Sequence, residues 1–187
     1  KLRDTKKKEK SIRIKHWGML GKSIRPLPEK WHGLTDTEER FRKRSLDLLM
    51  NEEVLTRFFK RSEILSFLRK YLAKEGFVEV ETPMLHPIAG GALARPFKTH
   101  HDALDHDFYL RIAPELYLKR LLIAGMEKIY ELGRNFRNEG IDITHNPEFT
   151  MLELYESFSN ATHHMVFLEK LFFALAKQIM KGISLSY

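Results

Sequence analysis

Residues 128–158 decide the fold of this chain, and they read KIYELGRNFRNEGIDITHNPEFTMLELYESF. Two stretches, 128–137 and 148–158, are rich in apolar and β-branched or aromatic residues, which is typical of β-strands. The residues between them are polar and include glycine and proline, so they read as a connecting loop. The sequence therefore predicts two strands joined by a polar loop.

A period of two divides the side chains of residues 148–156 between the two faces of their strand. One face suits burial under helices and carries Thr150, Leu152 and Leu154. The other face combines two aromatic rings, a thioether and a carboxylate, and carries Phe149, Met151, Glu153 and Tyr155. This mixture would suit a flat ring stacked on Phe149 beside a cation held by Glu153 and Tyr155. The alternative is a half-exposed strand whose polar side chains face water.

The loop before this strand carries a second signal. Arg137 offers a planar fork that fits phosphate oxygens, and His145 can add another donor. Glu139 can accept a hydrogen bond from an exocyclic amine. Each residue taken singly is more typical of a surface salt bridge. Their order, with Arg-Asn-Glu after one strand and His-Asn-Pro before the next, is much more specific.

The rest of the chain mixes helices with strands. Apolar residues spaced by three and four predict helices over 52–75 and 165–179, and Pro114 begins a third helix. Two further strands are predicted over 77–81 and 108–112. Glycines stand where these helices should end, at Gly76, Gly125 and Gly182. The predicted class is α+β, with an antiparallel sheet flanked by helices.

Charge and composition narrow the function classes. The formal net charge is +7, and residues 1–31 hold 11 of the 32 Lys and Arg but 3 of the 25 Asp and Glu. Such a basic segment suits a phosphate backbone, although a solvated arm is the alternative. The chain has no cysteine, which excludes disulfides and thiolate metal sites. No stretch reaches the ~18 consecutive apolar residues that a membrane-spanning helix needs, so no membrane partner is expected.

The segment from Phe136-Arg137-Asn138-Glu139 to Glu153-Leu154-Tyr155 closely resembles motif 2 of class II aminoacyl-tRNA synthetases, in the lysyl-tRNA synthetase form. Residues 52–83 look like motif 1, the dimer-interface element of that family. Residues 90–119 also resemble segments of the lysine enzymes, and residues 25–34 look like the exit from their anticodon-binding β-barrel. The resemblance implies that residues 1–34 are the remnant of an OB-type all-β barrel with its linker. Residues 35–187 are then the N-terminal part of the catalytic domain.

Motif 3 of that family, a glycine-rich strand and helix with an arginine for ATP, has no counterpart in these residues. The acidic residues that hold Mg²⁺ lie in the same later segment of the family, so no metal ligand is expected within this chain. A first residue that is lysine and not methionine agrees with this reading. We therefore expect a piece of a longer enzyme.

The resemblance also implies roles for individual residues. Arg137 is the expected catalytic residue, because it would clamp the α-phosphate of ATP. The implied ATP-binding residues are Arg137, Asn138, Glu139, His145, Asn146 and Phe149. The implied lysine-binding residues are Gly91, Glu115, Glu153 and Tyr155.

The implied activity is ATP-dependent conversion of L-lysine to lysyl-adenylate, followed by transfer to tRNA(Lys), in a cytoplasmic homodimer that uses Mg²⁺. Glu115 and Glu153 favour a cationic amino acid over aspartate, because a buried carboxylate without a cation is costly. One alternative is a synthetase paralogue that attaches lysine to a protein. Another is a non-catalytic fragment that dimerises or binds RNA.

Overall fold

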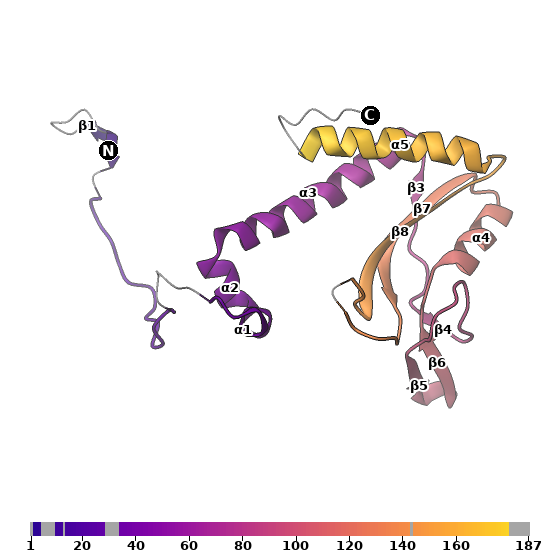
Figure 1. The fold of residues 1–187 in the computed structure, drawn as a ribbon, viewed down its shortest axis with the longest axis horizontal. Helices are drawn as coiled ribbons and strands as arrows, with labels where there is room; N and C mark the ends of the chain where they lie inside the picture. The colour runs from indigo at the N-terminus through magenta and orange to yellow at the C-terminus, as the bar shows by residue number, and fades with distance from the viewer. Residues whose placement is uncertain (1, 5–9, 13, 29–33, 143, 180–187) are drawn as a thin grey trace. The chain divides into compact units, whose positions relative to one another are not determined.

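The structure is a computed structural model that describes residues 2–4, 10–12, 14–28, 34–142 and 144–179. The chain divides into two compact units, Lys1–Phe58 and Phe59–Tyr187 (Figure 1). The expected domain boundary at residue 34 stays a prediction, because residues 29–33 lie outside the described residues.

The first unit begins with a short ladder in which β1 (Leu2–Asp4) pairs antiparallel with β2 (Lys10–Ile12). Two short helices follow later in the chain, α1 (Thr37–Arg42) and α2 (Arg44–Met50), which the sequence analysis did not predict. The Asp36 side chain caps the start of α1 by accepting a hydrogen bond from the backbone N–H of Glu39. The expected barrel remnant in residues 1–34 stays a prediction.

Asp47 is the buried polar centre of the first unit, with none of its surface exposed. Its carboxylate accepts hydrogen bonds from Arg40 Nε at 2.8 Å, Arg44 Nη1 at 2.6 Å and Asn51 Nδ2 at 2.7 Å. Burial acts to raise the pKa of Asp47, but these three donors together hold it below its ordinary value. The carboxylate thereby links α1, α2 and the residue that precedes the next helix.

The second unit is built on a three-stranded sheet in the order β3-β7-β8. The predicted hairpin is confirmed: β7 (Lys128–Phe136) and β8 (Glu148–Glu156) pair antiparallel over nine residues each. β3 (Val78–Glu79) runs parallel to β7, so the sheet is mixed at this edge. The strand expected over 77–81 is therefore shorter than predicted. Pro83 follows soon after and has no N–H to continue a ladder.

One face of this sheet carries the hydrophobic core, which lies under α3 (Glu52–Lys74) and α5 (Ala161–Ile179) (Figure 1). The fully buried members of the core are Leu72, Phe77, Tyr130 and Leu171. Side chains from both helices and from all three strands or their flanks meet there. Each Å² of apolar surface that is buried contributes about 25 cal/mol to stability. The apolar layer between the helices and the sheet is therefore the main source of stability in this unit.

Two of the predicted helix-ending glycines adopt the left-handed conformation, with φ of 86° at Gly76 and 98° at Gly125. Side chains with a Cβ are strained there, which is why glycine suits the end of a helix. Gly76 follows α3, and Gly125 follows α4 (Glu115–Ile123). Gly182 lies outside the described residues.

A second sheet has the order β4-β6-β5 and is antiparallel throughout. Its strands are β4 (Leu85–His86), β5 (Lys98–His101) and β6 (His106–Leu110). A 3₁₀ turn, η1 (Asp102–Leu104), joins β5 to β6. Only a strand over 108–112 was predicted here. β4 has two residues and β5 is polar and largely exposed, so neither shows the alternation that identifies a strand from sequence.

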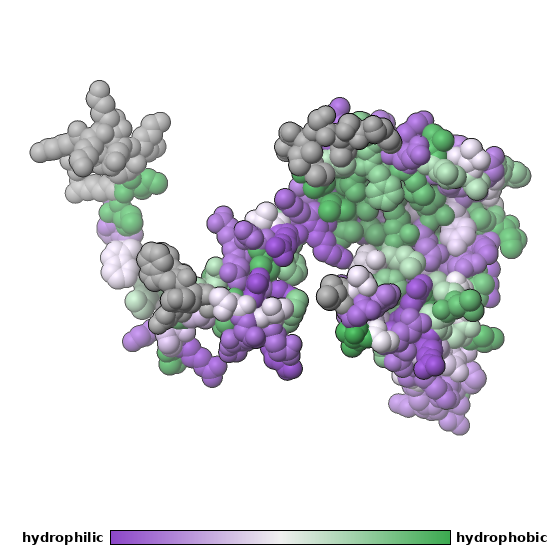
Figure 2. All heavy atoms as spheres, viewed as in Figure 1, coloured by the Kyte–Doolittle hydropathy of each residue, from purple (hydrophilic) through white to green (hydrophobic). Residues whose placement is uncertain are grey.

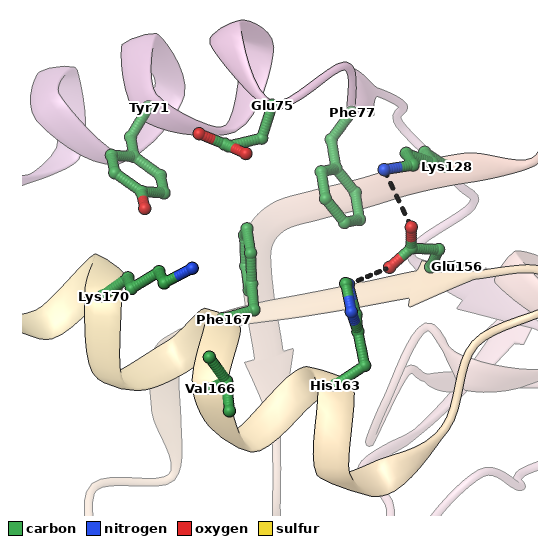
Figure 3. A pocket seen from close by; sticks show the side chains of 9 residues that line it. All are labelled: Tyr71, Glu75, Phe77, Lys128, Glu156, His163, Val166, Phe167 and Lys170. Carbon is green, nitrogen blue, oxygen red and sulfur yellow. Dashed lines mark ion pairs between the residues drawn. The ribbon is translucent and has the colours of Figure 1, made fainter.

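A hollow of about 250 Å³ opens at one end of the core, between α3, α5 and the start of β7 (Figure 3). Glu156 lies at its edge, 2.8 Å from Lys128 Nζ and 3.4 Å from His163 Nε2. The aromatic side chains in its wall are Tyr71, Phe77 and Phe167. In Figure 2 hydrophobic residues gather around α5 and the adjoining sheet. None of the helices in the described part of the chain is long and apolar enough to cross a membrane.

Candidate active site

The alternation predicted for residues 148–156 is confirmed by their packing. Leu152 and Leu154 pack against the core beneath the helices. The other face of β8 therefore points away from that core. Each residue on this second face lies opposite a residue of β7, in the pairs Phe149–Asn135, Met151–Gly133, Glu153–Glu131 and Tyr155–Ile129. The hairpin thus presents one composite face with carboxylates, amides and aromatic rings.

A hollow of about 250 Å³ lies where the loop joins β7 and β8. Five of the six predicted ATP-binding residues line it, namely Arg137, Glu139, His145, Asn146 and Phe149. The sixth, Asn138, is exposed and does not line it. The Asn138 backbone N–H donates instead to the carbonyl oxygen of Arg95 at 2.7 Å, which ties this loop to the segment before β5.

Arg137 is held over the ring of Phe149, with its guanidinium carbon 5.2 Å from the ring centre. Its backbone N–H donates to the carbonyl oxygen of Pro147 at 2.8 Å, so both ends of the loop are joined. Its side-chain Nε is buried and has no hydrogen-bond partner among the described residues. A buried, unpartnered cationic donor is a suitable group for an incoming anion.

Asp142 orders the turn of this loop, a role that the sequence analysis missed. Its Oδ1 accepts backbone N–H bonds from Thr144 at 2.7 Å and His145 at 2.8 Å, and its Oδ2 lies 2.8 Å from His145 Nδ1. The bond from the Thr144 backbone N–H is the main reason why the pKa of Asp142 lies well below its ordinary value. An Asp two residues before Thr is the sequence signal that could have predicted such a turn.

The predicted lysine-binding residues lie on three neighbouring elements. The Tyr155 hydroxyl donates to Glu153 Oε2 at 3.2 Å. Burial raises the pKa of Glu153, and the nearby carboxylates of Glu115 and Glu131 raise it further. The pKa of Tyr155 is also raised, by burial and by the Glu153 charge. No Lys or Arg in the described residues forms an ion pair with Glu153.

Gly91 lies against the base of Glu115, the first residue of α4. Its φ is 92°, and a Cβ at this position would stand 3.3 Å from the Cβ atoms of Ala113 and Glu115. The close approach brings the Gly91 backbone beside the Glu115 side chain. The Glu115 carboxylate pairs with Lys119, one turn further along α4, and the Lys119 side chain is more than half exposed. All four predicted lysine-binding residues therefore share one region.

Arg111 and Glu131 form a buried ion pair on the same face, and neither was predicted. The side chain of Arg111 is fully buried, and its Nη1 donates to Glu131 Oε1 and to Thr82 Oγ1, the latter at 3.1 Å. Thr82 Oγ1 in turn donates to Glu131 Oε2 at 2.6 Å. Arg111 Nε donates to the Arg134 carbonyl oxygen at 2.9 Å. Glu131 is a charged residue inside a strand, which is the signal that could have revealed it.

Comparison with known proteins places this chain in a family. A family model described as tRNA synthetases class II (D, K and N) matches residues 36–186. The chain belongs to the class II tRNA synthetase family. The hollow beside Arg137 and the carboxylates around Glu153 both lie within the matched residues.

Individual relatives of this class II tRNA synthetase chain carry a more specific name. A protein named Lysine--tRNA ligase from Carboxydothermus hydrogenoformans is 55% identical over 183 residues, covering 98% of this chain and 38% of the relative. Proteins of the same name from Clostridium tetani and Clostridium perfringens are 52% and 51% identical, covering 98% of this chain and 36% of each relative. The chain thus spans a little over a third of the length of these relatives.

Proposed function

We propose that this chain is part of a lysine–tRNA ligase, which activates L-lysine with ATP and transfers it to tRNA(Lys). The observation that carries the proposal is the state of Glu153. This half-buried carboxylate faces the carboxylates of Glu115 and Glu131 and has a tyrosine hydroxyl, but no cation, as its direct partner in the described part of the chain. A substrate with a side-chain ammonium would supply the missing charge. The relatives named Lysine--tRNA ligase agree with this choice.

Each predicted site residue has a role in this proposal. The adenine ring stacks on the face of Phe149 opposite Arg137, with Glu139 and Asn138 on the edge of the adenine. Arg137 binds the α-phosphate through donors that stacking on Phe149 orients, and His145 and Asn146 lie along the triphosphate. Glu115 and the Gly91 backbone receive the lysine α-ammonium, and Glu153 with Tyr155 receives the side-chain ammonium.

The proposed reaction has two steps. A carboxylate oxygen of lysine attacks the α-phosphorus of ATP, the bond to the β-phosphate oxygen breaks, and lysyl-adenylate and pyrophosphate form. A terminal ribose hydroxyl of the tRNA then attacks the adenylate carbonyl carbon, loses its proton, and releases AMP. Positioning and charge stabilisation carry most of the catalysis in such transfers, and Arg137 supplies stabilisation at the phosphorus that reacts.

Mg²⁺ is the expected companion of ATP. Among the described residues no three His, Asp or Glu side chains lie close enough together to hold a metal ion. The family resemblance implies that the acidic residues that hold Mg²⁺ lie in a later segment than these residues, so we propose no metal-ligand role for the residues described here. A cysteine-free chain suits a reducing compartment, so we propose that the enzyme acts in the cytoplasm.

We extend the proposal to the partners of the protein. The basic surplus of residues 1–31 supports contact with the phosphate backbone of tRNA. Three exposed apolar side chains of α3 support a homodimer through this helix: Leu55, Phe58 and Phe59, exposed by 38%, 48% and 67%. These residues belong to the segment that resembles the dimer-interface element of the family.

One assay tests the central proposal. In the complete protein, exchange of labelled pyrophosphate into ATP should depend on L-lysine and not on L-aspartate or L-asparagine. A charged product should then appear on tRNA(Lys). Lysine-dependent exchange without transfer to tRNA, but with transfer to a protein, would favour the paralogue alternative. Absence of any lysine-dependent exchange would favour a non-catalytic protein and contradict the proposal.

A further inference from the structure

The buried Arg111 has an unused donor on the face that carries Glu153. Its Nη2 is buried and has no hydrogen-bond partner among the described residues, although Nη1 and Nε are fully engaged. The guanidinium lies directly over Gly133, since a Cβ on that glycine would stand 2.3 Å from Nη2. Gly133 is next along this face of β7 from Glu131 and lies opposite Met151 of β8. Glycine at 133 is therefore what makes room for the guanidinium.

The charges around Glu153 come from each neighbouring element. Tyr155 lies on its own strand, Glu131 lies opposite on β7, Glu115 lies at the start of α4, and Arg111 follows β6. Glu131 and Glu115 are acidic and Arg111 is cationic. A second cation, Lys119, pairs with Glu115, but its side chain is more than half exposed. Within the described part of the chain, Arg111 is the one Lys or Arg that is buried. It therefore supplies the positive charge that offsets the acids at close range without screening by water.

We propose that Arg111 is a positioning residue of the lysine pocket, which neutralises Glu131 and so lets Glu153 stay ionised to bind the substrate ammonium. This inference rests on the function proposed above. Arg111 does not touch the substrate. It acts through the two carboxylates, and Gly133 holds open the space that its guanidinium occupies. Glu115 is already paired with Lys119. Without the charge of Arg111, the carboxylates of Glu131 and Glu153 would face each other with no cation between them before lysine arrives, and one of them would take up a proton instead.

The test is the pH dependence of the KM for lysine, measured by pyrophosphate exchange in the complete protein between pH 5.5 and 9. Lysine binding requires ionised Glu153, so the KM rises as acidification protonates that carboxylate. In Arg111→Gln the rise should begin about one pH unit higher than in the wild type. The lysine KM should then be about tenfold higher at the acidic end and nearly unchanged at pH 9. The kcat and the KM for ATP should change little.

Two further variants separate charge from packing. Arg111→Lys keeps the positive charge and loses the fork, so it should retain a pH profile close to that of the wild type while melting at a lower temperature. Glu131→Gln removes an acid that faces Glu153, so it should move the rise toward lower pH, opposite to Arg111→Gln. A purely structural role for the pair predicts no such opposite shifts. Arg40→Gln is the matched control, because it removes an arginine from buried Asp47 in the other unit.

The outcomes distinguish this inference from the proposed function. If the wild type shows lysine-dependent exchange, but Arg111→Gln raises the lysine KM by the same factor at every pH, the inference is wrong and the function stands. Shifts in the same direction for Arg111→Gln and Glu131→Gln would also overturn it. If the folded wild type shows no lysine-dependent exchange, the proposed function fails, and the inference fails with it. If Arg111→Gln does not fold, the Glu131→Gln shift decides alone.

Discussion

Glu131 and Glu153 lie directly opposite each other on the antiparallel strands β7 and β8. Two like charges facing each other across a strand pair destabilise it unless each finds a partner. Glu131 is paired with Arg111 and accepts a hydrogen bond from Thr82. Glu153 has only the Tyr155 hydroxyl as a direct partner in the described residues. The two carboxylates therefore differ in their partners: Glu131 is bound by a cation of the protein, and Glu153 by a hydroxyl alone among the described residues.

Replacing Arg137 tests the catalytic assignment. Negative charge gathers on the α-phosphate in the transition state, so a fixed guanidinium stabilises it more than it stabilises bound ATP. Arg137→Ala should lower the rate of adenylate formation by about 10²–10³. Arg137→Lys should recover little, because a point charge does not reproduce the planar fork. Single-turnover adenylate formation measures both. Near-normal rates in both variants, with lysine binding lost, would contradict these roles.

Replacing Asp142 tests the order of the loop that carries His145 and Asn146. Asp142→Ala removes the acceptor of two backbone N–H groups, so the KM for ATP should rise by about three- to tenfold, with the lysine KM unchanged. Asp142→Asn keeps an acceptor oxygen, so its KM for ATP should lie between those of the wild type and Asp142→Ala. Because the pKa of Asp142 is depressed, its bonds persist above that lowered value and are lost only as pH falls through it. A KM for ATP that is insensitive to both variants would show that the turn has no part in binding.

Replacing Glu156 tests the ion pair at the edge of the core hollow in Figure 3. The hydrogen bond from Lys128 is the main cause that lowers the pKa of Glu156, and burial opposes it. Glu156→Gln should cost about 1 kcal/mol of unfolding free energy at pH 7, since Lys128 is partly exposed. The difference should be present above the unfolded pKa of a glutamate and vanish as pH falls through the lowered folded value. Urea unfolding of both proteins at pH 7 and pH 3 measures it, with Lys128→Gln completing a double-mutant cycle.

Removing residues 1–31 tests the proposed contact with tRNA. The truncated protein should bind tRNA(Lys) more weakly, and the slope of log K against log salt concentration should flatten, because fewer counterions are released. The KM for lysine in pyrophosphate exchange should stay the same. An unchanged salt slope would show that this basic segment does not contact the phosphate backbone.

Replacing the exposed phenylalanines of α3 tests the proposed homodimer. Phe58→Ser with Phe59→Ser should shift the complete protein toward monomer at micromolar concentration, because burial of these rings would drive association. Sedimentation velocity measures the change. Phe172→Ser is a control, since Phe172 is a phenylalanine of α5 whose exposed fraction, 63%, is close to the 67% of Phe59. A wild type that sediments as a monomer would contradict the proposal.

Some of the fold and site could be read from local pattern. The period-two alternation of residues 148–156 separated Leu152 and Leu154 from Glu153, because successive side chains of a strand point to opposite faces. Arg137 and Phe149 stand at the two ends of one loop, so the hairpin itself brings them together. The short strands β4 and β5 were not predicted. β4 has two residues, too few to show an alternation of apolar and polar side chains, and β5 consists of polar residues only.

The amino-acid sequence by itself determined the hairpin, its two faces, and which residue types line the turn, because all of these follow from local periodicity. Only the tertiary structure decided that Arg111 reaches Glu131 and lies over Gly133, since these residues are brought together by strand register and by the path from β6 into α4. The cost of burying a charge depends on what lies within a few ångströms of it. Sequence spacing does not contain such distances. Only the folded chain therefore determines that Arg111 pairs with Glu131 and not with Glu153.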